Sequence, residues 1–348
     1  MARALAARGF GPTLVFTGQH PALTPGEFGL DGFPHFSLGC AGREDPHDHV
    51  RAVTIALLPL LGDSPDLVIV QGDTSSALGA ALACFIAGVP VAHVEAGLRT
   101  HDPLLPWPEE EYRCAIDADA DLLFAPTELA AANLRAEQVA GEVHVTGNTG
   151  IDALLEAASR LPLETLGEQR VPNILVTCHR RESWRDGLRS IADAIMELAD
   201  NGAVTVDVVL HPNAYVAGNM RRLLSRARGI SLIPPCGHQE LLLRMRQATL
   251  VLSDSGGIQE EAPALGVPLL VLRDKTERPE GLAAGTAILV GTDKERIVTE
   301  AHRLLVDPAA RAAMSRRVFP FGDGHAAPRI AGIIHGWLEE RSLTRRLA

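Results

Sequence analysis

Ser253-Asp254-Ser255-Gly256-Gly257-Ile258-Gln259-Glu260-Glu261-Ala262-Pro263 joins the apolar run 248–252 to a segment with the pattern of a helix. The apolar run predicts a buried strand, so the two glycines lie in a turn from a strand into a helix. Glycine lets the backbone come close to a ligand, and the first turn of a helix has free N–H groups at the positive end of its dipole. Such a turn suits a phosphate, and Glu261, about one turn further on, is placed for a sugar hydroxyl. An ordinary turn with a capping serine is the alternative interpretation.

The composition of the chain is that of a globular protein large enough for two domains, with 348 residues of which 46% are hydrophobic. A net charge of −11 and the lack of a long basic run disfavour a nucleic-acid partner. The longest apolar stretch, 77–94, is broken by Gly88 and Pro90, which favours a core helix and strand over a membrane span. We therefore expect neither a nucleic-acid nor a membrane partner.

The cysteines are scattered along the chain, at Cys40, Cys84, Cys114, Cys178 and Cys236. Their spacing matches no paired metal-binding motif, and their number is odd. This pattern predicts reduced thiols in a cytoplasmic protein. We expect no bound metal and no cofactor, because no dinucleotide-binding fingerprint is present either.

Short apolar runs alternate with helical patterns from end to end. Strands are predicted at 13–16, 66–70, 89–94, 122–125, 142–145, 173–177, 205–210, 229–233, 248–252, 268–272 and 287–290. Strands that alternate with helices across short loops predict parallel sheets covered on both faces, that is, a doubly wound α/β fold. Residues 21–46 have the composition of a loop rich in glycine and proline, and residues 328–347 have the pattern of one long helix.

The weakest link between the two halves is 161–172, which contains two prolines and follows a predicted helix. We place a domain boundary there. The predicted parts are an N-terminal domain at 1–162, a C-terminal domain at 163–327 and a final helix at 328–348.

Polar residues follow the predicted strands in both halves. They are Gln19, His20, Asp73, Glu95, His179, His211, Ser255, Gly256, Gly257 and Arg273. In open parallel sheets, ligands bind at the carboxyl ends of strands. Two such sheets that faced each other would line one cleft with all of these residues.

Each acidic candidate has a functional and a structural interpretation. Asp73 either takes part in catalysis or caps the helix that follows Thr74. Glu95 ends a buried strand with no clear helix after it, and partial burial would raise its pKa toward the range of a general acid or base. Glu109 is either a catalytic carboxylate or a favourable charge in the first turn of a helix.

The basic candidates are equally open. His179 precedes Arg180 and Arg181 at a strand end, which fits an anion or acid/base site as well as a solvated loop. His211 closes another strand and is either a ligand or a loop residue without a role. Arg278 either holds a phosphate or belongs to a surface ion pair.

Long runs of this sequence resemble the non-hydrolysing UDP-N-acetylglucosamine 2-epimerase family. They are Gln71-Gly72-Asp73-Thr74, His93-Val94-Glu95-Ala96-Gly97-Leu98-Arg99-Thr100, Pro106-Trp107-Pro108-Glu109-Glu110 with Arg113, Thr146-Gly147-Asn148-Thr149, Cys178-His179-Arg180-Arg181-Glu182, 254–263, 273–280 and Phe321-Gly322-Asp323-Gly324. The resemblance extends from about Thr17 to the C-terminus.

The resemblance implies a GT-B-like fold: two Rossmann-like domains, a cleft between them, and a C-terminal helix that crosses back to the first domain. It implies reversible conversion of UDP-GlcNAc to UDP-ManNAc by elimination and re-addition of UDP through 2-acetamidoglucal, in a cytoplasmic homodimer. By resemblance, the acid/base candidates are Asp73, Glu95, Glu109 and His179. The implied substrate-binding residues are Arg113, His211, Ser255, Gly256, Gly257, Glu261 and Arg278.

The chain departs from the family at its start. The family opens with a strand and a Gly-Thr-Arg-Pro-Glu turn, whereas Met1-Ala2-Arg3-Ala4-Leu5 resembles the helix that follows that turn. We therefore expect one strand of the first sheet and one phosphate ligand to be missing, through a misassigned start or a truncation, and low activity of the chain as written. Other activities stay open: an epimerase of another UDP-2-acetamido sugar, a GT-B glycosyltransferase, or an inactive UDP-sugar-binding homologue.

Overall fold

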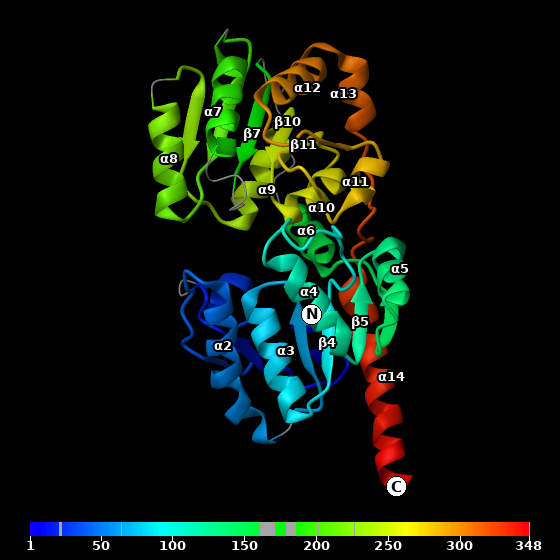
Figure 1. The fold of residues 1–348 in the computed structure, drawn as a ribbon. Helices are drawn as coiled ribbons and strands as arrows, with labels where there is room; N and C mark the ends of the chain where they lie inside the picture. The colour runs from blue at the N-terminus through cyan, green and yellow to red at the C-terminus, as the bar shows by residue number, and fades with distance from the viewer. Residues whose placement is uncertain are drawn as a thin grey trace. The chain divides into compact units, whose positions relative to one another are not determined.

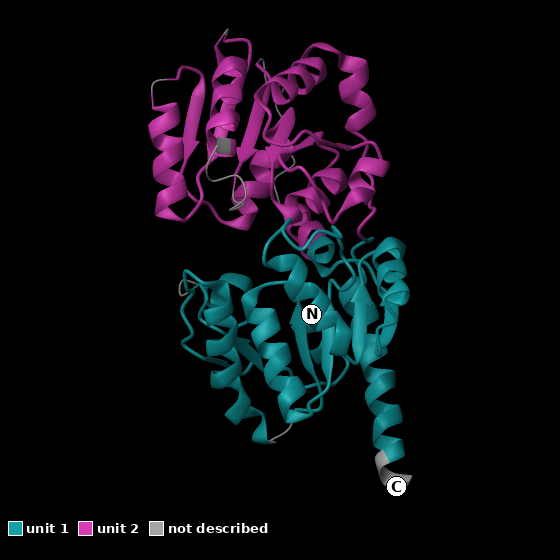
Figure 2. Ribbon diagram, in the orientation of Figure 1, with its two compact units in different colours: residues 1–152, 322–348 teal, residues 153–321 magenta. Residues whose placement is uncertain are grey.

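The computed structural model of the chain describes residues 1–20, 23–63, 65–160, 171–178, 186–200, 202–225 and 227–347. Tertiary contacts divide the chain into two compact units, coloured separately in Figure 2. Unit 1 comprises Met1–Asp152 and Gly322–Ala348, and unit 2 comprises Ala153–Phe321. The division falls inside helix α6 (Thr149–Arg160), whereas the predicted boundary after residue 162 lies outside the described residues. A helix that belongs to both units gives no local signal of a boundary, which explains the difference.

Unit 2 contains one six-stranded parallel sheet. Its strands are β7 (Asn173–Thr177), β8 (Thr205–Val209), β9 (Ile230–Ile233), β10 (Leu250–Ser253), β11 (Leu269–Val271) and β12 (Ala287–Leu289). Their spatial order is β9-β8-β7-β10-β11-β12, so the chain reverses its direction of travel between the neighbours β7 and β10. This is the strand order of a Rossmann sheet, and it confirms the predicted parallel α/β architecture.

Helices cover both faces of this sheet (Figure 1). They are α7 (Asp186–Ala199), α8 (Ala214–Leu224), α9 (His238–Gln247), α10 (Gly256–Leu265), α11 (Pro279–Ala283), α12 (Lys294–Val306) and α13 (Pro308–Met314). Alternate strand residues such as Ile174 and Val176 pack into one core with α7, α8 and α12. The intervening residue Leu175 is fully buried as well, and α9 and α10 contact the sheet. Burial on both faces explains why these strands are nearly continuous apolar runs.

Unit 1 contains two separate parallel sheets. The larger has the order β3 (Val68–Gln71), β4 (Val91–Val94), β5 (Leu122–Ala125) and β6 (Glu142–Val145). The smaller pairs β1 (Leu14–Phe16) with β2 (His35–Ser37). The prediction of a loop at 21–46 is wrong at β2. This strand has only three residues, all exposed, and its pairing with β1 rather than an apolar run makes it a strand.

The helices of unit 1 are α1 (Ala2–Ala6), α2 (Pro46–Leu57), α3 (Ser75–Ala87), α4 (Glu109–Asp119), α5 (Glu128–Ala136), the first part of α6, and α14 (Ala326–Leu347), with 3-10 turns η1 (Pro25–Phe28) and η2 (Leu58–Asp63). Residues of α2, α3, α4 and α5 form one core with the larger sheet. On the other face, Ala92 and Phe124 pack against Ile330 and Ile334 of α14 (Figure 1). The last helix of the chain therefore belongs to the core of the first sheet.

A cavity of about 990 Å³ lies between the two sheets of unit 1. Leu14–Phe16 from β1 and Val68–Gln71 from β3 line it, together with apolar residues of α1, η2 and α14. Within the residues that the structure describes, no helix is both long enough and apolar enough to cross a membrane.

Candidate active site

The first group of predicted site residues lies where β3 and β4 end in unit 1. Gly72 follows β3 with φ 68°, a left-handed conformation that favours glycine. Its N–H donates to the carbonyl of Val94, 3.0 Å away, so the turn that carries Asp73 is bound to the end of the neighbouring strand. The N-cap of α3 is Thr74, whose Oγ1 accepts from the Ala77 amide at 3.2 Å. The alternative in which Asp73 caps this helix is therefore wrong.

Asp73 instead accepts a hydrogen bond from the guanidinium of Arg113 on α4. Arg113 is 2% exposed and also donates to Glu110, with Nη1–Oε2 at 3.0 Å. The other carboxylate oxygen of Glu110 accepts from the amides of Thr100 and His101, at 2.9 Å each. One buried cation thus joins the α3 turn, α4 and the loop before α4, and it fixes the direction of the Asp73 carboxylate. Glu110 was not among the predicted site residues.

Glu95 lies directly after β4 and has a φ of 71°. A left-handed conformation costs a residue with a side chain about 1–2 kcal/mol, so the surrounding structure must hold it in place. The amides of Glu95 and Ala96 both donate to the carbonyl of Phe124, at 3.1 and 3.2 Å. A methyl group on Gly72 would lie 4.0 Å from Glu95 Oε2, so the Glu95 side chain reaches the turn that precedes Asp73. Backbone strain of this kind is concentrated at functional sites.

Glu109 is the first residue of α4, after its N-cap Pro108. It is half-buried, and it lies one helical turn before Arg113 on the same helix. The first-turn position that the sequence predicted is correct. The same position places Glu109 on the face of α4 that carries Arg113, the partner of Asp73.

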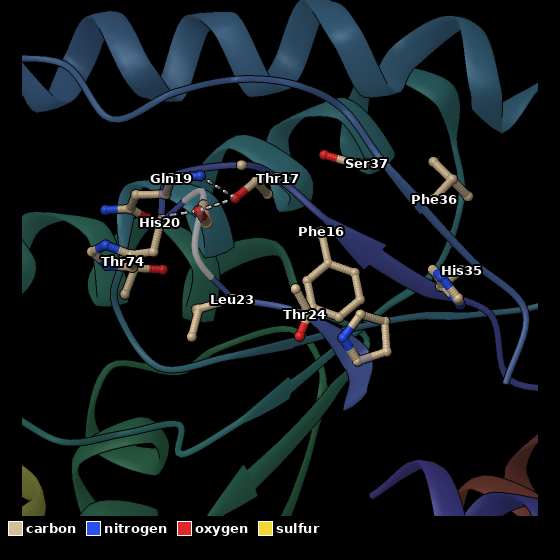
Figure 3. A pocket seen from close by; sticks show the side chains of 13 residues that line it. Phe16, Thr17, Gln19, His20, Leu23, Thr24, His35, Phe36, Ser37 and Thr74 are labelled. Carbon is tan, nitrogen blue, oxygen red and sulfur yellow. Dashed lines mark hydrogen bonds between the residues drawn. The ribbon is translucent and has the colours of Figure 1, made fainter. Parts of the chain in front are cut away.

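A pocket of about 420 Å³ opens beside Thr74 in unit 1 (Figure 3). It is lined by the segment that follows β1, including Thr17, Gln19 and His20, and by residues of η1 and β2. The hydroxyl of Ser76 donates to Gln19 Oε1 at 2.7 Å and lies 2.7 Å from Thr17 Oγ1. The prediction that Gln19 comes to the same sheet edge as Asp73 fits these contacts with the start of α3.

The second group of site residues lies at the carboxyl end of β10 in unit 2. Thr177 Oγ1 and Ser253 Oγ are 2.6 Å apart, so a hydrogen bond links the ends of β7 and β10 at the point where the strand order reverses. Ser255 occupies the N-cap of α10, but its hydroxyl makes no capping hydrogen bond. The interpretation as an ordinary turn with a capping serine is therefore wrong. The first amides of α10 lie at the carboxyl end of β10, where the strand order reverses, and Rossmann sheets bind ligands at this position.

The start of α10 lies directly against Arg278. A methyl group on Gly256 would be 2.7 Å from Arg278 Nη1, so only glycine allows this approach. Arg278 is 6% exposed, with Nε at 2.7 Å from Glu260 Oε1 and Nη1 hydrogen-bonded to Glu277. The surface ion pair predicted as an alternative for Arg278 is wrong, because the guanidinium is buried between two carboxylates.

Glu261 on α10 pairs with a histidine that the sequence analysis missed. His238 Nε2 and Glu261 Oε1 are 2.8 Å apart. This hydrogen bond to Glu261 raises the pKa of His238 above its ordinary value of 6.5, against the opposing effect of burial. His238 is the first residue of α9, directly after the N-cap Gly237, and a histidine directly after a glycine at a helix start was the available signal.

His211 and His179 are the two histidines that the sequence predicted as site residues. His211 follows β8, and its Nδ1 accepts from the Asn213 amide at 3.0 Å, next to the N-cap of α8. His179 lies outside the described residues. Within the described ranges, no group of three or more His, Cys, Asp or Glu side chains could hold a metal ion.

Comparison with known proteins identifies relatives of the whole chain. Residues 3–335 match the family model described as UDP-N-acetylglucosamine 2-epimerase. A protein of Ralstonia nicotianae named as a probable UDP-N-acetylglucosamine 2-epimerase is 46% identical over 290 residues, which cover 79% of this chain and 76% of that protein. The UDP-N-acetylglucosamine 2-epimerase of Escherichia coli K12 is 44% identical over 288 residues, 79% of this chain and 77% of that protein.

Solved structures agree with this match. The structure of a UDP-GlcNAc 2-epimerase from Neisseria meningitidis bound to UDP-GlcNAc superposes with a TM-score of 0.89 at 34% identity, and covers 97% of this chain and 96% of the other. The Methanocaldococcus jannaschii enzyme, in complex with UDP-GlcNAc and UDP, has a TM-score of 0.83 at 31% identity, with 96% and 94% coverage. The similarity therefore extends over both units.

Proposed function

The chain belongs to the UDP-N-acetylglucosamine 2-epimerase family, and on this premise we propose that it interconverts UDP-GlcNAc and UDP-ManNAc. The proposed reaction inverts carbon C2 of the hexose while the product keeps its UDP. Relatives named for this activity at 44–46% identity support the substrate. The structures of two relatives that contain UDP-GlcNAc support it further.

The proposed chemistry is elimination followed by re-addition. The proton on C2 is not next to a carbonyl, so its simple removal is too costly. If the C1–O bond to UDP breaks as a base takes this proton, UDP leaves with the bonding electrons and the sugar becomes 2-acetamidoglucal. UDP then adds back at C1 while a proton is delivered to the other face of C2. Both half-reactions need a general acid or base on each face of the sugar and a firm hold on the leaving diphosphate.

The proton transfers are assigned to the carboxylates of unit 1. The observation that carries this proposal is the convergence of Asp73 and Glu95 at adjacent strand ends, with Asp73 oriented by the buried Arg113. Glu95 is held in a left-handed conformation, as expected for a residue whose position matters more than local stability. Glu109 and His179 remain acid/base candidates of the proposal.

The UDP is assigned to unit 2. We expect Ser255 and the amides of Gly256 and Gly257, at the start of α10, to bind the diphosphate, because a helix N-terminus without a side-chain cap favours an anion. Arg278 lies against the same turn, and its guanidinium, which also binds Glu260 and Glu277, is the proposed arginine partner of the diphosphate. We expect Glu261 to bind the ribose and His211 to contact the substrate.

The proposal is tested by incubating the protein with UDP-GlcNAc in deuterated water and following C2 by NMR. We expect solvent deuterium at C2 in a sugar that still carries UDP, and a second set of signals from UDP-ManNAc. Deuterium in a different UDP-2-acetamido sugar, with none in UDP-GlcNAc, would assign the activity to another substrate. Transfer of the sugar to an acceptor would indicate a glycosyltransferase, and binding without exchange would indicate an inactive homologue. Each of these three results would refute the proposal.

A further inference from the structure

A buried group of charged side chains lies directly behind the two strand ends that carry Asp73 and Glu95. We call His93, Asp117 and Arg99 the buried clamp. His93 is in β4 and Asp117 is in α4, and both are completely buried. Arg99 is 5% exposed and its guanidinium also binds Glu137 at the end of α5, at 2.7 and 2.8 Å. Desolvated charges of this kind are costly, so three in one place need an explanation beyond stability.

The partners of His93 determine its protonation. Its Nε2 lies 2.9 Å from the carbonyl oxygen of Gly72, which can only accept a hydrogen bond. Its Nδ1 lies 2.6 Å from Asp117 Oδ1. The other oxygen of Asp117 accepts from the Gly97 amide at 3.1 Å and from Arg99 at 2.8 Å, so the carboxylate is ionised. Both ring nitrogens of His93 therefore donate, and the ring is an imidazolium cation.

The charges around His93 support this state. Burial by itself lowers the pKa of His93, but the charge and hydrogen bond of Asp117, the Gly72 carbonyl and the charge of Glu95 together raise it above 6.5. Burial raises the pKa of Asp117, and His93 and Arg99 more than offset this, so that the net shift is downward. The groups that face the ring are thus Asp117, Glu95 and, through Asp117, Arg99.

The clamp contacts both turns that bear the candidate carboxylates. Through Gly72 O it holds the peptide immediately before Asp73, and the Gly72 amide is bound in turn by Val94 O at 3.0 Å. Through Asp117 it holds Gly97, two residues after Glu95. Gly97 has no freedom to move toward α5, because a methyl group on it would lie 2.2 Å from the Ala130 carbonyl oxygen.

We propose that His93 is a positioning residue which, as a permanent imidazolium bound to Gly72 and Asp117, sets the spacing between the Asp73 and Glu95 carboxylates. This inference rests on the proposed function in one respect: the spacing of the two carboxylates affects catalysis only if they carry out the proposed proton transfers. The protonated state and the contacts of the clamp stand without it. His93 itself does not touch substrate, because it is sealed in the core.

The first experiment measures the ring of His93 in the unmodified protein by ¹⁵N-edited NMR. We expect two ring N–H protons that are still present above pH 6.5, since an imidazolium held on both sides exchanges slowly and does not titrate near 6.5. A single ring N–H, or a titration near 6.5, would overturn the proposal. This measurement needs no activity, so it separates the clamp from the proposed function.

The second experiment compares His93→Gln and Asp117→Asn with the unmodified protein. We expect kcat for deuterium exchange at C2 to fall roughly 100-fold, the loss typical of a small misplacement, while the Kd for UDP in unit 2 stays unchanged. His144→Gln is the matched control, because His144 is in β6 of the same sheet, where its ring lies beside Phe124 and its Nε2 is 3.4 Å from Glu142 Oε2. It should keep kcat.

Equal activity of His93→Gln, Asp117→Asn and the unmodified protein would overturn the positioning role. Loss of UDP binding together with activity would assign a merely structural role and would also overturn it. If His93→Gln does not fold, Asp117→Asn and the ring protons decide the matter. An unmodified protein without any exchange at C2 would refute the proposed function instead, and the NMR result would still judge the clamp.

Discussion

The approach of Arg278 to Gly256 gives a prediction that two neighbouring glycines can test against each other. In Gly256→Ala, the new methyl group would lie 2.7 Å from Arg278 Nη1 and 3.0 Å from its Cζ, closer than atoms in contact allow. In Gly257→Ala, the nearest atom is Ser255 Oγ at 4.0 Å, an ordinary contact. Both glycines are in the first turn of α10, so both substitutions remove the same backbone freedom.

The expected difference in the free energy of unfolding between the two variants can be estimated, because most other effects of the substitutions are the same in both. Glycine to alanine at a compatible position stabilises a protein by about 0.4–1 kcal/mol, and this gain cancels in the comparison. Overpacking costs about 1–3 kcal/mol when the neighbour cannot move. The end of an arginine side chain is usually mobile, but here Glu260 and Glu277 hold the guanidinium in a buried position. We therefore expect Gly256→Ala to be less stable than Gly257→Ala by about 1–3 kcal/mol.

Differential scanning calorimetry measures this difference as the separation of the unfolding midpoints of unit 2, at about 2–4 °C for each kcal/mol. Isothermal titration with UDP measures the second consequence. If Arg278 helps to hold the diphosphate, its displacement in Gly256→Ala should weaken UDP binding by about tenfold, the loss of one charge-assisted hydrogen bond. Equal midpoints for the two variants would refute the close contact between Arg278 and the start of α10.

Three further predictions follow from other parts of the molecule. Glu95→Gln should lower the rate of deuterium exchange at C2 by roughly 10²–10⁴-fold with unchanged UDP affinity, whereas Glu128→Gln, on the exposed surface of α5, should not; full activity of Glu95→Gln would remove it from the proton transfer. By NMR, the midpoint of His238 should lie above 6.5 and return to the ordinary value in Glu261→Gln. Because the pKa of His238 is raised in the folded protein, its pair with Glu261 stabilises unit 2 below pH 6.5, and this contribution disappears as the pH rises through the folded pKa. A titration midpoint of His238 below 6.5 would contradict the contact. EDTA should leave the exchange rate at C2 unchanged, and a strong loss would show that a metal takes part.

Features that depend on neighbours along the chain could be predicted from the sequence. The strand β10 and the turn at Ser255 are encoded by an apolar run followed by two glycines, and the structure has both. The first-turn position of Glu109 is likewise local, since a helix start needs only the residues that form it. The parallel α/β architecture follows from the alternation of these local signals.

Contacts between residues far apart in the chain were decided only by the tertiary structure. Arg113 reaches Asp73 across 40 residues, and without that contact the sequence left a capping role for Asp73 open. Arg278 was expected at the surface because charges usually are, and only the packing of Glu260 and Glu277 around it makes burial possible.

The same reason applies to the clamp and to β2. In the sequence, His93 is one residue of an apolar strand. Its ring is charged because it contacts Asp117 of α4, which lies 24 residues later in the chain. The strand β2 has no apolar pattern of its own and depends on hydrogen bonds from β1. Periodicity and propensity reflect interactions within a segment and between that segment and solvent. Strand pairing, burial of charge and protonation depend instead on residues that folding brings together from distant parts of the chain.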